Sequence, residues 1–143
     1  MRYRRRWVAL VPLIVVVMLA ACQEVSSEEH ATEEPYRLES VDGTDLSRVI
    51  LTERAAQRLG IQAASVETGG DGSVIPAAAV LYDPNGEEWV YTSPEPLVFV
   101  RHAITVDRFK GGIAVLSDGP PAGTEVVIVG AAELYGAESG VGN

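Results

Sequence analysis

The chain has 143 residues, with 20 acidic residues against 11 lysines and arginines and a formal net charge of −9. The phosphates of nucleic acids repel a chain this acidic, so we expect no nucleic-acid partner. Its single cysteine has no partner for an intrachain disulfide, so the fold must depend on its apolar core.

Residues 1–21 have the pattern of a secretory signal peptide. Arginines at positions 2, 4, 5 and 6 form a basic head, an apolar run extends from Trp7 to Ala21, and the last two residues of the run are small. The run of about 15 residues is shorter than the roughly 18–20 that a spanning helix needs. This favours a cleaved leader over an uncleaved signal anchor in which Cys22 is an ordinary apolar residue. Removing the leader leaves 122 residues with a net charge of about −13.

The leader ends in Leu19-Ala20-Ala21-Cys22, which resembles the lipobox of bacterial lipoproteins: an aliphatic residue, two small residues and a cysteine. The resemblance implies cleavage before Cys22, a diacylglyceryl thioether on its sulfur, and acylation of the new amino terminus, as by palmitate. It predicts a protein that is lipid-anchored to the cell membrane on its extracytoplasmic face. Acylation also explains an odd cysteine in an exported chain.

Residues 22–35 read CQEVSSEEHATEEP, with five glutamates and no lysine or arginine. Such a composition cannot bury enough apolar surface to offset the entropy of ordering, which predicts a disordered tether extended by its like charges. The alternative is a metal-binding patch around His30. One histidine among scattered carboxylates is a poor site for a selective metal.

The chain changes character at Tyr36, and residues 36–73 predict a strand, a short helix and a strand. Thr52 suits the N-cap of a helix that ends at Leu59, and Gly60 suits its C-cap. The segment ETGGDGS that follows, residues 67–73, is predicted to be a turn or linker. It lacks the lysine and the hydroxyl residue of a phosphate-binding P-loop.

Residues 74–136 are predicted to form a β domain. Val74–Tyr82 is apolar and extended, Asp83–Gly86 (DPNG) fits a type I turn, and Trp89–Thr92 returns as the partner strand. The acidic residues around this turn suggest calcium as an alternative, but their spacing does not match an EF-hand loop.

Apolar residues alternate along the next segment, residues 98–106. One face carries Val98, Val100, His102, Ile104 and Val106, and the other carries Phe99, Arg101, Ala103 and Thr105. Two further strands follow at 113–116 and 124–129, and the chain then fades from Gly130 into small residues, with residues 137–143 as a tail. Together these signals predict a mainly β fold, a small β-barrel or sandwich-like domain with one short helix.

The residues offer no catalytic constellation. The sequence has no histidine pair at metal spacing, no nucleophile elbow and no CxxC motif. His102 lies on the apolar face of its predicted strand, which favours a core or edge histidine over a functional one. We therefore expect no enzyme activity, no cofactor and no metal site.

Three stretches of the β region carry a family resemblance: VIPAAAVLYDPNGEEWVYT, FVRHAITV and SDGPPAGTEVVIVG. They resemble parts of periplasmic adaptor subunits (membrane fusion proteins) of efflux pumps, the last with Pro120 where the family has leucine. The matching positions are Ile75, Pro76, Ala79, Val80, Val90, Tyr91, Phe99, Arg101, Ile104, Gly119, Gly123, Val126, Val127 and Gly130. The earlier segment VILTERAAQRLGIQAASVE also resembles a part that many such adaptors carry ahead of their middle domains.

The chain departs from the family between Val66 and Val74, where the seven intervening residues leave no room for a lipoyl domain or an α-helical hairpin. The resemblance therefore implies a truncated adaptor: a non-catalytic interaction module for an efflux-type transporter of the inner or cytoplasmic membrane. The alternative is a stand-alone lipoprotein that binds a small ligand or a cell-wall component. That alternative predicts a concave pocket.

Overall fold

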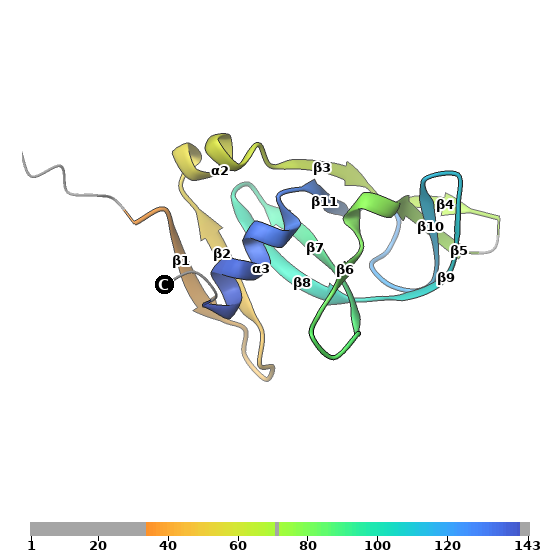
Figure 1. Cartoon of the computed structure of the whole chain (residues 1–143), viewed down its shortest axis with the longest axis horizontal. Helices are drawn as coiled ribbons and strands as arrows, with labels where there is room; N and C mark the ends of the chain where they lie inside the picture. Colours follow the sequence, from red (N-terminus) through yellow and green to blue (C-terminus); the bar gives the residue numbers. More distant parts are fainter. Residues whose placement is uncertain (1–33, 71, 141–143) are drawn as a thin grey trace, which may run out of the picture. The chain divides into compact units, whose positions relative to one another are not determined.

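The computed structural model describes residues 34–70 and 72–140, and the described chain from Glu34 onward forms one compact unit (Figure 1). The predicted leader, Cys22 and most of the predicted tether, including His30, lie outside the described residues. The described part is mainly β, as the sequence predicts, but it contains two α-helices instead of one. Its sheets do not close into a barrel.

The strands form two antiparallel sheets. In chain order the elements are β1 (Tyr36–Ser40), β2 (Ser47–Leu51), α2 (Glu53–Leu59), β3 (Gln62–Ser65), β4 (Glu67–Gly69), β5 (Gly72–Pro76), the 3₁₀ helix η1 (Ala77–Ala79), β6 (Leu81–Tyr82), β7 (Glu88–Glu95), β8 (Val98–Ala103), β9 (Thr105–Lys110), β10 (Ile113–Asp118), β11 (Glu125–Val129) and α3 (Ala131–Ser139). The larger sheet has the order β1-β2-β8-β7-β11-β3, with β6 also paired to β7. The smaller sheet has the order β4-β5-β10-β9.

The two segments expected at 36–73 and 74–136 are interleaved in this unit. Strand β2 of the first segment pairs with β8 of the second, and β3 pairs with β11. The boundary between residues 73 and 74 falls inside β5. The strand predicted at 74–82 is not continuous, because η1 separates β5 from β6. The predicted DPNG hairpin is confirmed, with Leu81 opposite Trp89 across the turn.

The chain passes from the larger sheet to the smaller one at Ile104. The alternation over residues 98–106 predicted a single strand, but β8 belongs to the larger sheet and β9 to the smaller. Ile104 lies between them, buried, and its N–H donates to the carbonyl of Glu88 at 3.0 Å. The predicted face is broken at this point, and His102 is exposed instead of lying in the core. A change of sheet is a long-range event that local periodicity does not record.

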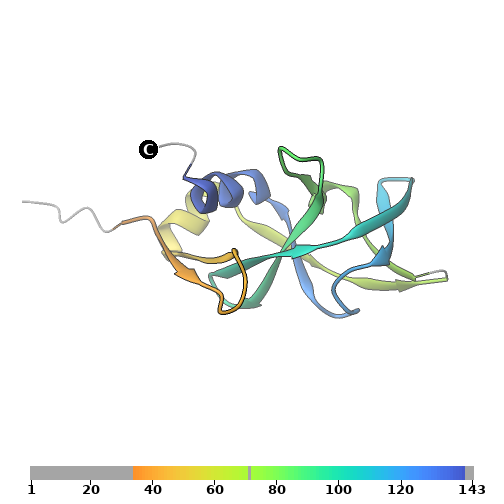
Figure 2. The ribbon, with the colours of Figure 1, turned by 90° about the horizontal axis from the view of Figure 1, so that it is seen from below.

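Two apolar clusters form the core, one on each face of the central strands β7 and β11. Val90 and Val126 belong to the inter-sheet cluster, which comprises Val66, Ile75, Ala79, Val90, Ile104, Ala114, Leu116 and Val126. Tyr91 and Val127, their neighbours in sequence, belong to the helix-side cluster, which comprises Val49, Leu51, Ala55, Tyr91, Phe99, Val127 and Leu134. Adjacent residues of a strand point to opposite faces, so these two strands are buried on both sides. Figures 1 and 2 show α2 and α3 at one end of the unit and the smaller sheet at the other.

Helix α2 forms for the local reasons that the sequence predicts. The hydroxyl of Thr52 accepts a hydrogen bond from the N–H of Ala55 at 3.2 Å, which satisfies a donor of the first turn. Gly60 ends the helix in the left-handed conformation, with φ of 63°, and its N–H donates back to the carbonyls of the last turn. Both predicted caps are confirmed.

Helix α3 is a correction to the sequence interpretation, which has the chain fading into small residues from Gly130 and a tail at 137–143. The helix begins after Gly130, whose φ is 94°, and ends at Gly140 in the left-handed conformation. Its only fully buried side chain is that of Leu134. Alanines and glycines hide the apolar stripe that normally reveals a helix, so packing against the sheet decides this segment.

Candidate functional site

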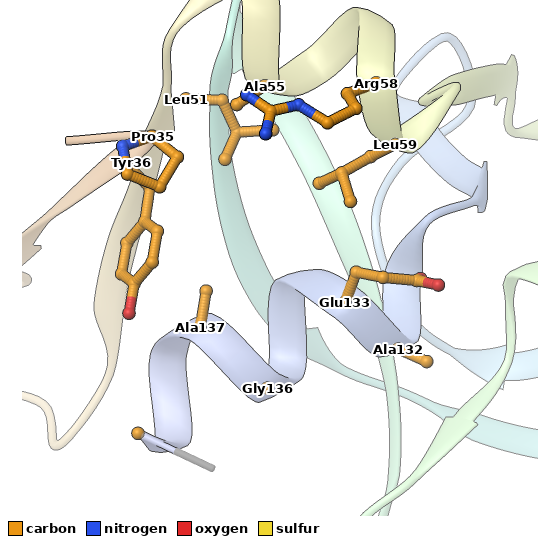
Figure 3. Close-up of a pocket in the computed structure, with 11 residues that line it drawn as sticks. Pro35, Tyr36, Leu51, Ala55, Arg58, Leu59, Ala132, Glu133, Gly136 and Ala137 are labelled. Atoms are coloured by element: carbon orange, nitrogen blue, oxygen red, sulfur yellow. The ribbon is translucent and has the colours of Figure 1, made fainter. Parts of the chain in front are cut away.

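A cleft with a volume of about 700 Å³ opens between α2 and α3 (Figure 3). It is lined by Pro35, Tyr36, Leu51, Ala55, Arg58, Leu59, Ala132, Glu133, Gly136, Ala137 and Gly140. Every lining residue except Arg58 and Glu133 is uncharged, and most of them are apolar. The volume lies within the range of roughly 300–1,000 Å³ that is typical of small-molecule sites.

The walls of the cleft come from segments far apart in the sequence. Figure 3 shows the side chains of Leu59 and Ala137 pointing into the gap between the two helices, with the ring of Tyr36 along one side. Leu51 and Ala55 belong to the helix-side cluster and are almost fully buried, so the cleft is continuous with the core. The small residues of α3 leave the gap open, because no long side chain from that helix fills it.

Arg58 lies at the mouth of the cleft and has no partner in the described part of the chain. Its side chain is exposed and forms no ion pair or hydrogen bond with any described residue. In Figure 3 its guanidinium extends over Ala55 toward Pro35 and Tyr36. The carboxylate of Glu133 points away from these residues. The cleft therefore combines an apolar lining with one available cation.

A partly buried charge network fixes the opposite side of α3 to the sheet. Nε of Arg101 lies 2.8 Å from Oε2 of Glu138, with only 15% and 6% of the two side chains exposed. The Tyr91 hydroxyl donates to the same Oε2 atom at 2.5 Å, and the backbone N–H of Ser47 donates to Oε1 at 3.2 Å. Glu138 thereby connects α3 to β2, β7 and β8, and holds in place the helix that forms one wall of the cleft.

Aromatic rings flank the charged pair. The guanidinium of Arg101 lies 4.7 Å from the ring centre of Trp89 and 5.3 Å from that of Tyr135, distances at which a cation is attracted to an aromatic face. Burial, together with the hydrogen bond to Glu138, raises the pKa of Tyr91 well above its ordinary value. Tyr91 therefore stays protonated and keeps donating to the carboxylate.

The DPNG turn is explained by its own backbone hydrogen bonds. Oδ1 of Asp83 accepts from the N–H groups of Asn85 at 2.8 Å and Glu87 at 2.9 Å. Burial raises the pKa of Asp83, but hydrogen bonding, chiefly from these backbone donors, outweighs it and leaves the pKa below its ordinary value. Within residues 34–70 and 72–140, no group of three or more histidine, cysteine, aspartate or glutamate side chains lies close enough to hold a metal ion.

The sequence did not predict where the cleft lies or which residues line it, although the alternative function predicted a concave pocket. Cys22 and the histidine of the alternative metal patch lie outside the described residues, and His102 is exposed on β8 away from the cleft lining. The sequence assigns Arg58 no role beyond its place in the predicted helix that ends at Leu59. Two signals were available: the glycines at 130 and 140, which bound a helix-length segment, and the Leu134 and Glu138 side chains spaced four residues apart within it.

Comparison of the chain with known proteins identifies no relative, so its function has to be argued from the geometry of the structure. No protein-family model matches the chain, and no curated protein or solved structure matches it. Among the described residues, no helix is both long and apolar enough to cross a membrane.

Proposed function

We propose that this protein is a non-catalytic binding module that binds an apolar ligand in the cleft between α2 and α3. Its lipid anchor on Cys22 holds it at the extracytoplasmic face of the cell membrane. The observation that carries the proposal is the cleft itself, which has the volume and the apolar lining of a ligand site. The leader and its Leu-Ala-Ala-Cys exit support the anchor.

A binding role without turnover follows from the chemistry of the lining. Among the described residues that line the cleft there is no serine, threonine, cysteine, histidine or lysine, the groups that most often act as nucleophile or base. The charged groups present are a guanidinium, which does not lose its proton in proteins, and the exposed Glu133. Such a set can orient a ligand, but it offers no nucleophile paired with a base.

The binding function is tested with the neutral fluorescent probe N-phenyl-1-naphthylamine and residues 23–143, which retain the whole compact unit. We expect saturable binding that Ala137→Phe abolishes, because the ring fills the gap between the helices. Ala103→Phe is the matched control, since Ala103 is exposed on β8 and does not line the cleft. Absence of saturable binding, or equal binding by both variants, would contradict the proposal.

A second function, docking on a membrane transporter as a truncated adaptor, is favoured by the open edges of the sheets. Strands β1 and β3 end the larger sheet, and β4 and β9 end the smaller one, so each has one edge without a partner strand among the described residues. Such edges can pair with another chain. Two large apolar side chains are also exposed, Tyr82 on β6 by 53% and Phe109 on β9 by 52%.

Photocrosslinking in the native membrane separates the two functions. A photoreactive residue at position 82 or 109 should trap an integral membrane protein if the docking function holds. If neither position crosslinks to an integral membrane protein and the probe binds saturably, the docking function is contradicted and only the ligand-binding function is supported. Mass spectrometry of the membrane fraction tests the anchor: we expect an acylated amino terminus at Cys22, and an unmodified chain that begins at Met1 would contradict it.

A further inference from the structure

We infer that the ligand of the cleft is a single-chain anionic lipid of the membrane that holds the anchor. Its tail lies along the apolar lining between α2 and α3, and its head group pairs with Arg58. This inference rests on the proposed function and adds the chemical class of the ligand and the residue that selects it.

The lining suits one apolar tail. The side chains that face the gap are hydrocarbon, from Leu51, Leu59 and Ala137, and the ring of Tyr36 offers a flat apolar wall. Removing apolar surface from water is favourable in proportion to the area buried. A hydrocarbon tail therefore gains binding free energy along the whole length of such a lining. The cleft is open between the helices, which lets an elongated molecule enter from the side.

The head group is selected by charge. Arg58 has no ion-pair partner among residues 34–70 and 72–140, the chain has a formal net charge of −9, and the guanidinium lies over the mouth of the cleft. A guanidinium forms short, charge-assisted and often bidentate hydrogen bonds with carboxylate or phosphate oxygens. Arg54, one turn earlier on α2, does not line the cleft. One cation at the mouth of an apolar site matches one anionic group on an apolar tail.

The position of the cleft in the chain points to the membrane as the source. Pro35 lines the cleft and follows Cys22 by 13 residues, which span at most about 45 Å when fully extended. On the proposed anchor, the cleft therefore stays within that distance of the lipid surface. A lipid with one chain leaves a bilayer more readily than a lipid with two, because each buried methylene adds to its retention.

The inference is tested by displacement of N-phenyl-1-naphthylamine with three compounds that share a dodecyl chain: dodecanoate, dodecan-1-ol and dodecyltrimethylammonium, each below its micelle concentration. We expect dodecanoate to displace the probe at the lowest concentration. Arg58→Gln should weaken displacement by dodecanoate about five-fold and leave dodecanol unchanged, because only the charged pair is lost. Arg54→Gln is the matched control and should behave as the unsubstituted chain.

The outcomes distinguish the two proposals. If the probe binds in the cleft but dodecanoate and dodecanol displace it equally, with or without Arg58, the inference is overturned and the binding function stands. If the probe does not bind the cleft at all, the binding function fails before any competitor is added.

The source of the ligand is tested with the full lipidated protein purified from its membrane. Mass spectrometry of the extracted lipids should show a single-chain anionic lipid that is depleted in Ala137→Phe and retained in Ala103→Phe. Equal recovery of such a lipid from the two variants would overturn the membrane source.

Discussion

The two faces of the central strands differ in what covers them. The inter-sheet cluster is covered by other strands and contains only apolar side chains, such as Ile75 and Leu116. The helix-side cluster is covered by two short helices, borders the Arg101–Glu138 pair and opens into the cleft. The same two strands thus supply a closed core on one face and an accessible site on the other.

The elements on the two faces are held in different ways. Ladders of backbone hydrogen bonds hold the strands around the inter-sheet cluster. Helix α3 is held by one fully buried leucine, by the partly buried side chains of Ala131, Tyr135 and Ala137, and by one charge network. Elements with few buried apolar contacts open locally at lower free energy than core strands do. Ligand entry beside α3 is therefore compatible with a stable unit, because the opposite face does not have to move.

The largest effect is expected where both clusters share a strand. Val127→Asp places an unpaired carboxylate in the helix-side cluster at a position with 0% exposure, and Val126→Asp does the same on the other face. Each should reduce the free energy of unfolding by more than about 4 kcal/mol, enough to abolish cooperative unfolding. Val129→Asp is the control, since that side chain is 41% exposed. An unchanged melting temperature for either buried variant would mean that the two-sided burial is wrong.

The next prediction separates the two faces by their effect on binding. Leu116→Ala and Leu134→Ala each create a cavity at a fully buried leucine, which should cost about 2–4 kcal/mol in chemical denaturation. Only Leu134→Ala should also weaken probe binding, because Leu134 packs α3, which lines the cleft, against the core. If Leu116→Ala and Leu134→Ala weaken probe binding equally, then binding does not depend on the helix-side face in particular.

A smaller effect is expected from the charge network. Glu138→Gln keeps the shape of the side chain but leaves the partly buried guanidinium of Arg101 without its counter-charge, which should cost about 2–3 kcal/mol. Glu133→Gln, on the exposed side of the same helix, should change the free energy of unfolding by less than about 0.5 kcal/mol. Similar values for the two variants would mean that the network does not hold α3.

The smallest effect is expected from the hydroxyl of Tyr91, and it depends on pH. Tyr91→Phe removes one hydrogen bond to a carboxylate and should cost about 1.5 kcal/mol at neutral pH. Because burial and Glu138 raise the pKa of Tyr91 in the folded state, the unfolded chain loses this proton first as pH rises above about 10. The free energy of unfolding should then decrease as pH rises, and the decrease should be smaller in Tyr91→Phe than in the unsubstituted chain. Parallel declines in denaturation series would contradict the raised pKa.

The parts of the fold that could be predicted are those fixed by neighbours in the chain. Thr52 and Gly60 define α2, and the DPNG turn defines the hairpin of β6 and β7. The site could not be predicted in the same way. Its walls come from residues 35–36, 51–59 and 132–140, and nothing local in any of these segments indicates that the other two lie beside it.

The sequence by itself determined the mainly β class and the ends of α2, because caps, turns and alternation depend on backbone conformation and on hydrogen bonds within a few residues. Only the tertiary structure decided the change of sheet at Ile104, the helix at 131–139 and the cleft. A helix with so few large apolar residues is not stable alone in water. It forms because Leu134 packs into the core and Glu138 pairs with Arg101. These partners are distant in the chain, and only the folded protein brings them together.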